Sequence, residues 1–217
     1  MKRVVAVTGD FYHQKAWADE SLQRAAQPLI DAGEISLEFI DAEQLVATLQ
    51  EKPDVAILFK ENRINPQDEQ VRIWMDAEAE EQIAKYVREG GAWLGWHAGL
   101  ASYPEDGAYV DMLRGHFLSH PVEHQVVRYE AAEGAGIGDP QQPFSFLDEH
   151  YFVSVREAET EVFLRSSSVD GESIGGWRHA FGQGKVLCLT PAHLQDGLNH
   201  PAFTEVLRQS LSWCAKQ

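Results

Sequence analysis

Apolar runs alternate with amphipathic segments through the first half of the chain. The runs are continuous and rich in Val, Ile and Leu, which is typical of strands covered on both faces. The segments between them carry apolar residues at a spacing of three and four, and Gly33 and Gly90-Gly91 mark two of their ends. The predicted strands are 4–7, 37–40, 55–59 and 92–96, and the predicted helices are 22–30, 42–49 and 76–87. This alternation favours a parallel sheet with helices on both faces.

The pattern changes after the fourth predicted strand. A short helix is expected at 109–113, strands at 122–129, 150–155, 160–164, 172–177 and 185–190, and a closing amphipathic helix at 203–213. The glycine-bearing stretch 133–140 follows no buried strand and leads into prolines, which favours a surface loop over a phosphate cradle. With no repeat and no linker, we expect one domain over residues 1–217. Its fold class is α/β, a three-layer α/β/α sandwich whose mostly parallel sheet has antiparallel additions in the C-terminal third.

Composition and charge narrow the range of partners. Of the 217 residues 44% are hydrophobic and 24% are charged, which is an ordinary globular balance, and the net charge is −16. That charge repels phosphate backbones and anionic lipids, so neither nucleic acid nor membrane is an expected partner. The first residues predict a strand, not a signal peptide. Cys188 and Cys214 lie among apolar residues, which favours two buried thiols and a cytoplasmic location.

Two histidines follow strands at the edge where ligands bind in open α/β sheets. His97 comes after the strand at 92–96 and His193 after the strand at 185–190, so both should lie at the carboxyl edge of the sheet. Either imidazole could instead hydrogen bond a loop at the strand end. We predict that both belong to a functional site.

His116, His120 and His124 are spaced four residues apart, which on a helix would place them on one face. Pro121 argues against that helix, because the residue before a proline favours an extended backbone. The segment is therefore expected to be a loop followed by a strand. His120 is the best candidate metal ligand of the three, and His124 is expected to be solvated.

Further candidate groups lie in the last third. Glu149 can bind a metal, act as a base or orient an imidazole, whereas hydrolysis by Glu149 with Asp148 is less favoured because neighbouring strand positions face opposite ways. Trp177, Arg178 and His179 combine an aromatic ring with polar groups suited to binding a sugar, although Trp177 could equally be core. Arg114 is a further candidate for substrate binding.

Several familiar chemistries lack their motifs. The sequence contains no His-Glu-x-x-His, no Cys-x-x-Cys and no Gly-x-x-x-x-Gly-Lys-Ser/Thr. What it does have is a set of imidazoles with a carboxylate, the usual ligands of Zn²⁺ and similar ions. The candidate metal ligands are His97, His120, Glu149 and His193, the candidate metal is Zn or Mn, and the candidate catalytic residues are His97, Glu149 and His193.

Four motifs together resemble the ThuA-like trehalose-utilisation family. They are Gly90–Ala98, Arg114–Phe117 with His120-Pro121, Asp148–Tyr151, and Trp177–Val186, followed by Ala192-His193 and Trp213. The resemblance implies a flavodoxin-like fold related to class I glutamine amidotransferases, a role in the use of a disaccharide or keto-sugar, and a homodimer. The stretch 131–143 departs from the family pattern, which implies that substrate contacts there differ.

The amidotransferase nucleophile is a cysteine on the turn after the strand that matches Ala92–Trp96, and here His97 stands in its place. An imidazole cannot form the thioester that glutamine hydrolysis needs, so glutaminase activity is not expected. Two hypotheses stay open. One is a carbohydrate-processing enzyme, for example a metal-dependent isomerase, lyase or hydrolase; the other is a non-catalytic sugar-binding or complex-forming module on the same scaffold.

Overall fold

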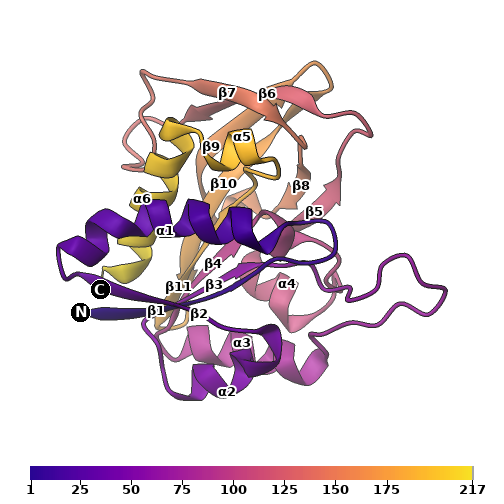
Figure 1. Ribbon diagram of the computed structural model, residues 1–217, viewed down its shortest axis with the longest axis vertical. Coiled ribbons are helices and arrows are strands. Elements are labelled where there is room, and N and C mark those ends of the chain that lie inside the picture. The colour runs from indigo at the N-terminus through magenta and orange to yellow at the C-terminus, as the bar shows by residue number, and fades with distance from the viewer. Residues whose placement is uncertain (217) are drawn as a thin grey trace.

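The computed structural model describes residues 1–216 and is built on a sheet with strand order β2-β1-β3-β4-β11-β10-β9-β6-β7 (Figure 1). The first five strands in that order are parallel to one another. They are β2 (Ile35–Phe39), β1 (Lys2–Thr8), β3 (Val55–Phe59), β4 (Ala92–Trp96) and β11 (Gly184–Leu189). The other four continue the sheet in antiparallel fashion: β10 (Gly171–Phe181), β9 (Glu161–Ser168), β6 (Gln125–Ala131) and β7 (Phe144–Asp148). A separate two-stranded sheet pairs β5 (Gly115–Ser119) with β8 (Phe152–Val155).

Helices cover both faces of the parallel strands because alternate strand residues point to opposite sides. Val4 and Ala6 belong to the core beneath α1 and α6, whereas Val5 and Val7 belong to the core beneath α2, α3 and α4. Figure 1 shows α1 and α6 on one side of these strands and α2 and α3 on the other. The helices are α1 (Lys15–Asp31), α2 (Leu45–Gln50), α3 (Ala77–Arg88), α4 (Ala108–Leu113), α5 (Gln195–Leu198) and α6 (Pro201–Ala215). The predicted three-layer α/β/α fold is confirmed.

The structure corrects the predicted elements between residues 113 and 150. Strand β5 lies where a loop was expected, β7 was not predicted, and β6 covers 125–131 in place of 122–129. In β7 only alternate residues are inward-facing, and the strand is five residues long, so its periodic signal is weak. The stretch 133–140 is a loop as predicted, but it is not wholly on the surface, because Ala135 and Ile137 are buried against the core.

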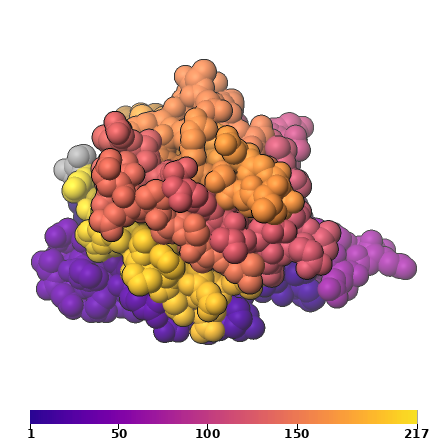
Figure 2. All heavy atoms as spheres, turned by 90° about the horizontal axis from the view of Figure 1, so that it is seen from above, coloured from indigo at the N-terminus to yellow at the C-terminus, as the bar shows by residue number. Residues whose placement is uncertain are grey.

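The segment between β3 and α3 projects from the body of the molecule, as Figures 1 and 2 both show. It is held at its base by an antiparallel bridge between Arg63 and Ile73. Both cysteines are buried and free, as predicted. Within residues 1–216 no helix combines the length and the apolar character needed to cross a membrane.

Candidate metal centre at the carboxyl edge of the sheet

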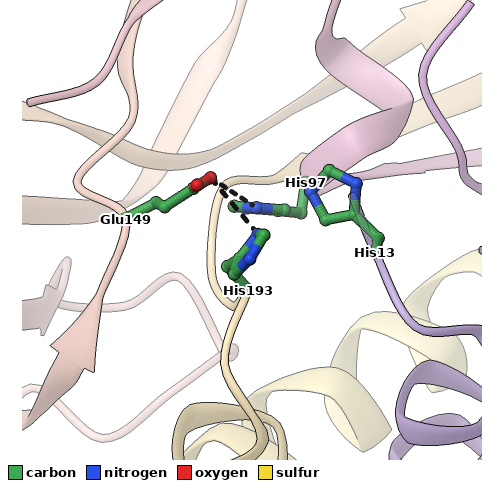
Figure 3. A group of neighbouring side chains, drawn as sticks. All are labelled: His13, His97, Glu149 and His193. Atoms are coloured by element: carbon green, nitrogen blue, oxygen red, sulfur yellow. Dashed lines mark ion pairs between the residues drawn. The ribbon is translucent and has the colours of Figure 1, made fainter. Parts of the chain in front are cut away.

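Three histidines and one glutamate converge where the parallel strands end (Figure 3). His13, His97 and His193 follow β1, β4 and β11, and Glu149 follows β7 at the far side of the sheet. One nitrogen of each histidine and one carboxylate oxygen all lie within 4.8 Å of one another. Residues far apart in the sequence therefore meet because their strands end at the same edge.

His97 is fixed by the turn that follows β4. It has a left-handed backbone, with φ of +44°, and begins a short 3₁₀ turn, η2 (His97–Leu100). Its Nδ1 lies 2.5 Å from the Thr190 carbonyl oxygen, which can only accept, so Nδ1 carries the hydrogen and the lone pair of Nε2 faces the cluster. The Tyr151 ring stacks on the imidazole at 4.0 Å between centroids. Burial lowers the pKa of His97 to about 4, which keeps the imidazole neutral and able to bind a metal at neutral pH.

His13 is held by Asp10 in the loop after β1. The Asp10 Oδ1 atom accepts the backbone N–H groups of Tyr12 at 2.9 Å and His13 at 3.0 Å, which folds the loop into a turn. The same oxygen lies 2.6 Å from His13 Nδ1, so Nε2 is left facing the cluster. Burial alone would raise the pKa of the Asp10 carboxyl, but hydrogen bonds and charge from His13 more than offset it, so its pKa is lowered and it stays ionised.

Asp148 and Glu149 are neighbours in sequence and act on the same loop in different ways. The Asp148 side chain is buried and accepts the backbone N–H of His193 at 2.7 Å. Glu149 points into the cluster, with Oε2 3.3 Å from His193 Nδ1 and 3.6 Å from His97 Nε2. The end of β7 thus positions the His193 backbone through one residue and contacts its ring through the next.

The carboxylate and the imidazoles adjust one another's protonation. Burial raises the pKa of the Glu149 carboxyl, but the nearby imidazoles of His193 and His97 outweigh that effect and bring its pKa below the ordinary value. Burial lowers the pKa of His193, and the Glu149 carboxylate more than reverses this, so its pKa is raised. Glu149 is therefore an anion at neutral pH, the form that binds a cation.

The polar atoms of the cluster fit a divalent cation. His13 Nε2, His97 Nε2 and His193 Nδ1 are buried and make no hydrogen bond with any described residue. A buried polar atom without a partner costs about 1–3 kcal/mol, and here three such atoms lie together. Three imidazole nitrogens and a carboxylate oxygen are a donor set that suits Zn²⁺ or Mn²⁺. A metal would satisfy all three nitrogens at once.

The structure brings together three of the four predicted metal ligands. His97, Glu149 and His193 belong to the compact group, whereas His120 lies on its outer side, with Nε2 3.8 Å from Glu149 Oε1. His124, which was expected to be solvated, lies at the same distance from that oxygen, and both side chains are 36% exposed. These two histidines form the solvent side of the site.

The four predicted substrate-binding residues do not reach the cluster. Trp177 is fully buried and donates its indole N–H to the Leu113 carbonyl at 2.8 Å, so it offers no face to a sugar. Arg178 forms two hydrogen bonds with Glu161. His179 is buried with Nε2 2.9 Å from the Met112 carbonyl oxygen, and Arg114 ends α4 with a left-handed backbone and donates to the Glu159 carbonyl. Their contacts hold α4, β9 and β10 together, which is a structural role.

His13 was not among the predicted site residues, although the sequence carries a signal for it. His13 follows the first predicted strand by only a few residues, as His97 and His193 follow theirs. The rule that placed those two at the carboxyl edge applies equally to His13.

Comparison with known proteins agrees with the fold. At 17% identity and a TM-score of 0.69, a ThuA-like protein of Bacteroides uniformis is similar over 99% of this chain and 91% of its own. A cytoplasmic protein of Salmonella typhimurium is similar at 16% identity and a TM-score of 0.65, over 99% of this chain and all of its own. A β-galactosidase of Bacillus circulans is similar at 12% identity and a TM-score of 0.63, over 97% of this chain but only 31% of the enzyme. At these identities the likeness shows the fold alone.

No functionally curated protein matches the sequence. The family model described as trehalose utilisation matches residues 3–214, which is nearly the whole chain. This chain therefore belongs to the ThuA family.

Proposed function

We propose that this protein is a metal-dependent enzyme that acts on a carbohydrate, with a site built from His13, His97, His193 and Glu149. The observation that carries the proposal is the meeting of three buried, unpartnered imidazole nitrogens with one carboxylate within 4.8 Å. A bound divalent ion would act as a Lewis acid toward a carbonyl or hydroxyl oxygen of the substrate. The family description supports a carbohydrate as the substrate class.

The residues around the cluster suit proton transfer next to a keto group, as in isomerisation or elimination. Glu149 is an anion whose Oε1 faces His120 and His124 on the solvent side. A proton taken up at Glu149 Oε1 can pass through a bridging water to either imidazole, each 3.8 Å away, and then to solvent, because both rings are partly exposed. Tyr151 and Phe117, whose ring centroids are 4.4 Å apart, cover the cluster beside His97 and help to exclude water.

An aromatic pair beside His13 offers the surface for a sugar ring that Trp177 does not. Phe11 and Tyr12 pack edge to face at 5.0 Å, and their exposed fractions are 54% and 45%. Exposed aromatic rings next to a polar site stack on the apolar faces of sugars. The location that we propose is cytoplasmic, which the naming of two structural neighbours as cytoplasmic proteins of Salmonella typhimurium supports.

The first experiment measures bound metal. Protein purified without chelator is analysed for its elements, as wild type and as the single variants His13→Ala, His97→Ala and His193→Ala, with His116→Ala as the matched control because His116 lies 3.6 Å from Glu105 and outside the cluster. We expect about one metal ion per chain in the wild type and the control, and loss of it in the other three. Absence of metal in the wild type after Zn²⁺ or Mn²⁺ has been added would refute the metal centre.

The second experiment measures whether the protein catalyses proton exchange in a keto-sugar. Metal-loaded protein is incubated with keto-sugars in D₂O, and exchange of the hydrogen next to the keto group is followed by NMR. We expect exchange in the wild type and a loss of at least about 10²–10⁴-fold in Glu149→Gln, because a general base contributes about that factor and the same substitution also removes a metal donor. Saturable sugar binding with no exchange would favour a non-catalytic binding module.

A further inference from the structure

A concave site lies at the opposite edge of the sheet from the histidine cluster. It is a cavity of about 660 Å³ at the amino ends of β3, β4 and β11, closed in by α2, α3 and the end of α6. Ala92 and Lys185, the second residue of β11, line it, whereas Trp96 and Leu189 at the other ends of the same strands adjoin the histidine cluster. Strands of this length separate the two edges by about 15 Å.

The side chains that line this cavity carry more positive than negative charge, unlike the molecule as a whole. The chain carries a net charge of −16 and has only seven lysines, yet five of them line this one cavity together with two acidic residues, Asp54 and Glu89. The five are Lys2, Lys52, Lys85, Lys185 and Lys216. Gathering like charges costs repulsion, and an anionic ligand removes that cost.

Two of the five lysines have neither an acidic partner nor a side-chain hydrogen bond among the described residues. Lys2 pairs with Asp54 at 2.9 Å, and Lys85 lies 3.9 Å from Glu89. Lys185 is held in place by the Trp213 carbonyl at 3.1 Å and lies over the Trp213 ring. No ion pair within residues 1–216 involves Lys52 or Lys216, which come from the end of α2 and the end of α6. Their ammonium groups are the ones left to bind a ligand.

We propose that this cavity binds a small organic phosphate of about the size of a sugar phosphate. Lysine binds phosphate as a point charge, and ligand sites commonly have volumes of about 300–1,000 Å³. Inorganic phosphate alone would leave most of the cavity unfilled. Glutamine amides and the apolar side chains of Val46, Leu49 and Pro53 also line the cavity and suit the organic part of such a ligand. A nucleic acid is disfavoured, because the rest of the acidic surface would repel it.

The test measures binding of glucose 6-phosphate by titration calorimetry at low ionic strength, with inorganic phosphate and glucose as comparison probes. The cavity variant is Lys52→Glu with Lys216→Glu. The matched control is Arg128→Glu with Arg165→Glu, which makes the same change in net charge at exposed positions on β6 and β9. A second control, His97→Ala with His193→Ala, removes the histidine cluster.

We expect saturable binding of glucose 6-phosphate by the wild type and both controls, tighter than that of either comparison probe. Affinity should fall by about tenfold or more in the cavity variant and should weaken as salt is added. Unchanged affinity in the cavity variant, an equal loss in the arginine control, loss in the histidine control, or equally tight binding of inorganic phosphate would overturn the proposal. If the charge reversals lower the unfolding temperature, Lys52→Ala with Lys216→Ala replaces them, with the same outcomes expected.

Discussion

Asp10 shows how one side chain outside the metal group can set the properties of a ligand. Its Oδ1 lies 2.6 Å from His13 Nδ1 and also accepts the backbone N–H groups of Tyr12 and His13. A carboxylate in this position orients the ring, fixes its tautomer and makes the other nitrogen a stronger donor to a metal. The two functions, folding the loop and tuning the imidazole, can be separated by substitution.

Asp10→Asn should lower metal affinity by about 10–100-fold. The asparagine oxygen can still accept the N–H groups of Tyr12 and His13, but it has no charge to polarise the imidazole. Its amide nitrogen cannot accept the Glu61 N–H that Asp10 Oδ2 accepts at 2.8 Å, so some stability is lost as well. Competition with a chromophoric chelator measures the change, and Asp31→Asn at the exposed end of α1 is the control. Equal affinity in wild type and Asp10→Asn would show that Asp10 only shapes the loop.

Residue by residue, the sequence predicts positions along the chain better than the direction of side chains. His97 and His193 were predictable because the ends of parallel strands share one edge. Trp177 was not, because a tryptophan in an alternating strand can face either the core or solvent, and only the packing of α4 against β10 buries it. His120 and His124 depend on where a loop after β5 folds back, which no local pattern encodes.

At the scale of elements, the 3₁₀ turn η2 holds His97 by close packing on β3. A Cβ atom added at Gly99 would lie 2.1 Å from the Leu58 carbonyl oxygen, far inside contact distance. The backbone of β3 cannot yield easily, because β3 is paired with strands on both sides. A side chain at position 99 must therefore displace the turn.

Gly99→Ala should lower both stability and metal affinity, because the shifted turn carries His97 out of the cluster. We expect a loss of about 1–3 kcal/mol in the free energy of unfolding, as for overpacked cores, measured by denaturant titration, together with weaker metal binding. Metal affinity equal to that of the wild type would show that the turn adapts without moving His97.

Asp76→Ala is the matched control for general destabilisation. The Asp76 side chain caps α3 by accepting the Ala79 N–H at 2.9 Å, and removing such a cap costs about 1 kcal/mol. This variant should lose stability to a similar degree but bind metal as the wild type does. A parallel loss of metal affinity in both variants would mean that metal binding simply follows global stability.

Helices and strands with a clear pattern of apolar residues were predictable from the sequence, and those without such a pattern were not. The strands β1, β3 and β4 are continuous apolar runs because both faces are covered, and α3 has a cap and a clear apolar stripe. Strand β5 has no such signal, because its residues go from buried to exposed along its length and it pairs only with β8. Its existence depends on a long-range partner and not on its own sequence.

Across the whole molecule, the antiparallel strands complete a site that the parallel strands begin. His13, His97 and His193 come from the parallel part, whereas Glu149 comes from the far end of β7, four strands beyond β11. The carboxylate can reach the cluster only because the chain after β7 folds back and Asp148 holds the loop that bears His193. Removing the antiparallel part would therefore leave His97 and His193 without their counter-charge.

The stability of the whole molecule should depend on pH through His179. Burial lowers its pKa to about 4 from the usual 6.5, and Nδ1 is buried with no partner, so a proton there would be unsatisfied. On unfolding, the imidazole takes up a proton below pH 6.5, whereas the folded protein stays neutral down to about pH 4. The contribution of His179 to the free energy of unfolding is therefore complete above pH 6.5 and is lost as the pH falls to about 4. The total loss is about 3 kcal/mol.

His179→Gln isolates this contribution, because a glutamine amide can donate to the Met112 carbonyl but does not titrate. Other buried groups also change the stability over this pH range. Burial raises the pKa of Asp148 to about 7, so its contribution to stability falls as the pH rises, opposite to that of His179. The variant must therefore be compared with the wild type at each pH. Denaturant titrations of metal-free protein measure the free energy of unfolding. The value for the variant should rise relative to that of the wild type as the pH falls from about 7 to about 4.5. A constant difference in the free energy of unfolding between variant and wild type over this pH range would contradict the prediction. It would show that the protonation of His179 is the same in the folded and unfolded protein, so that burial does not govern it.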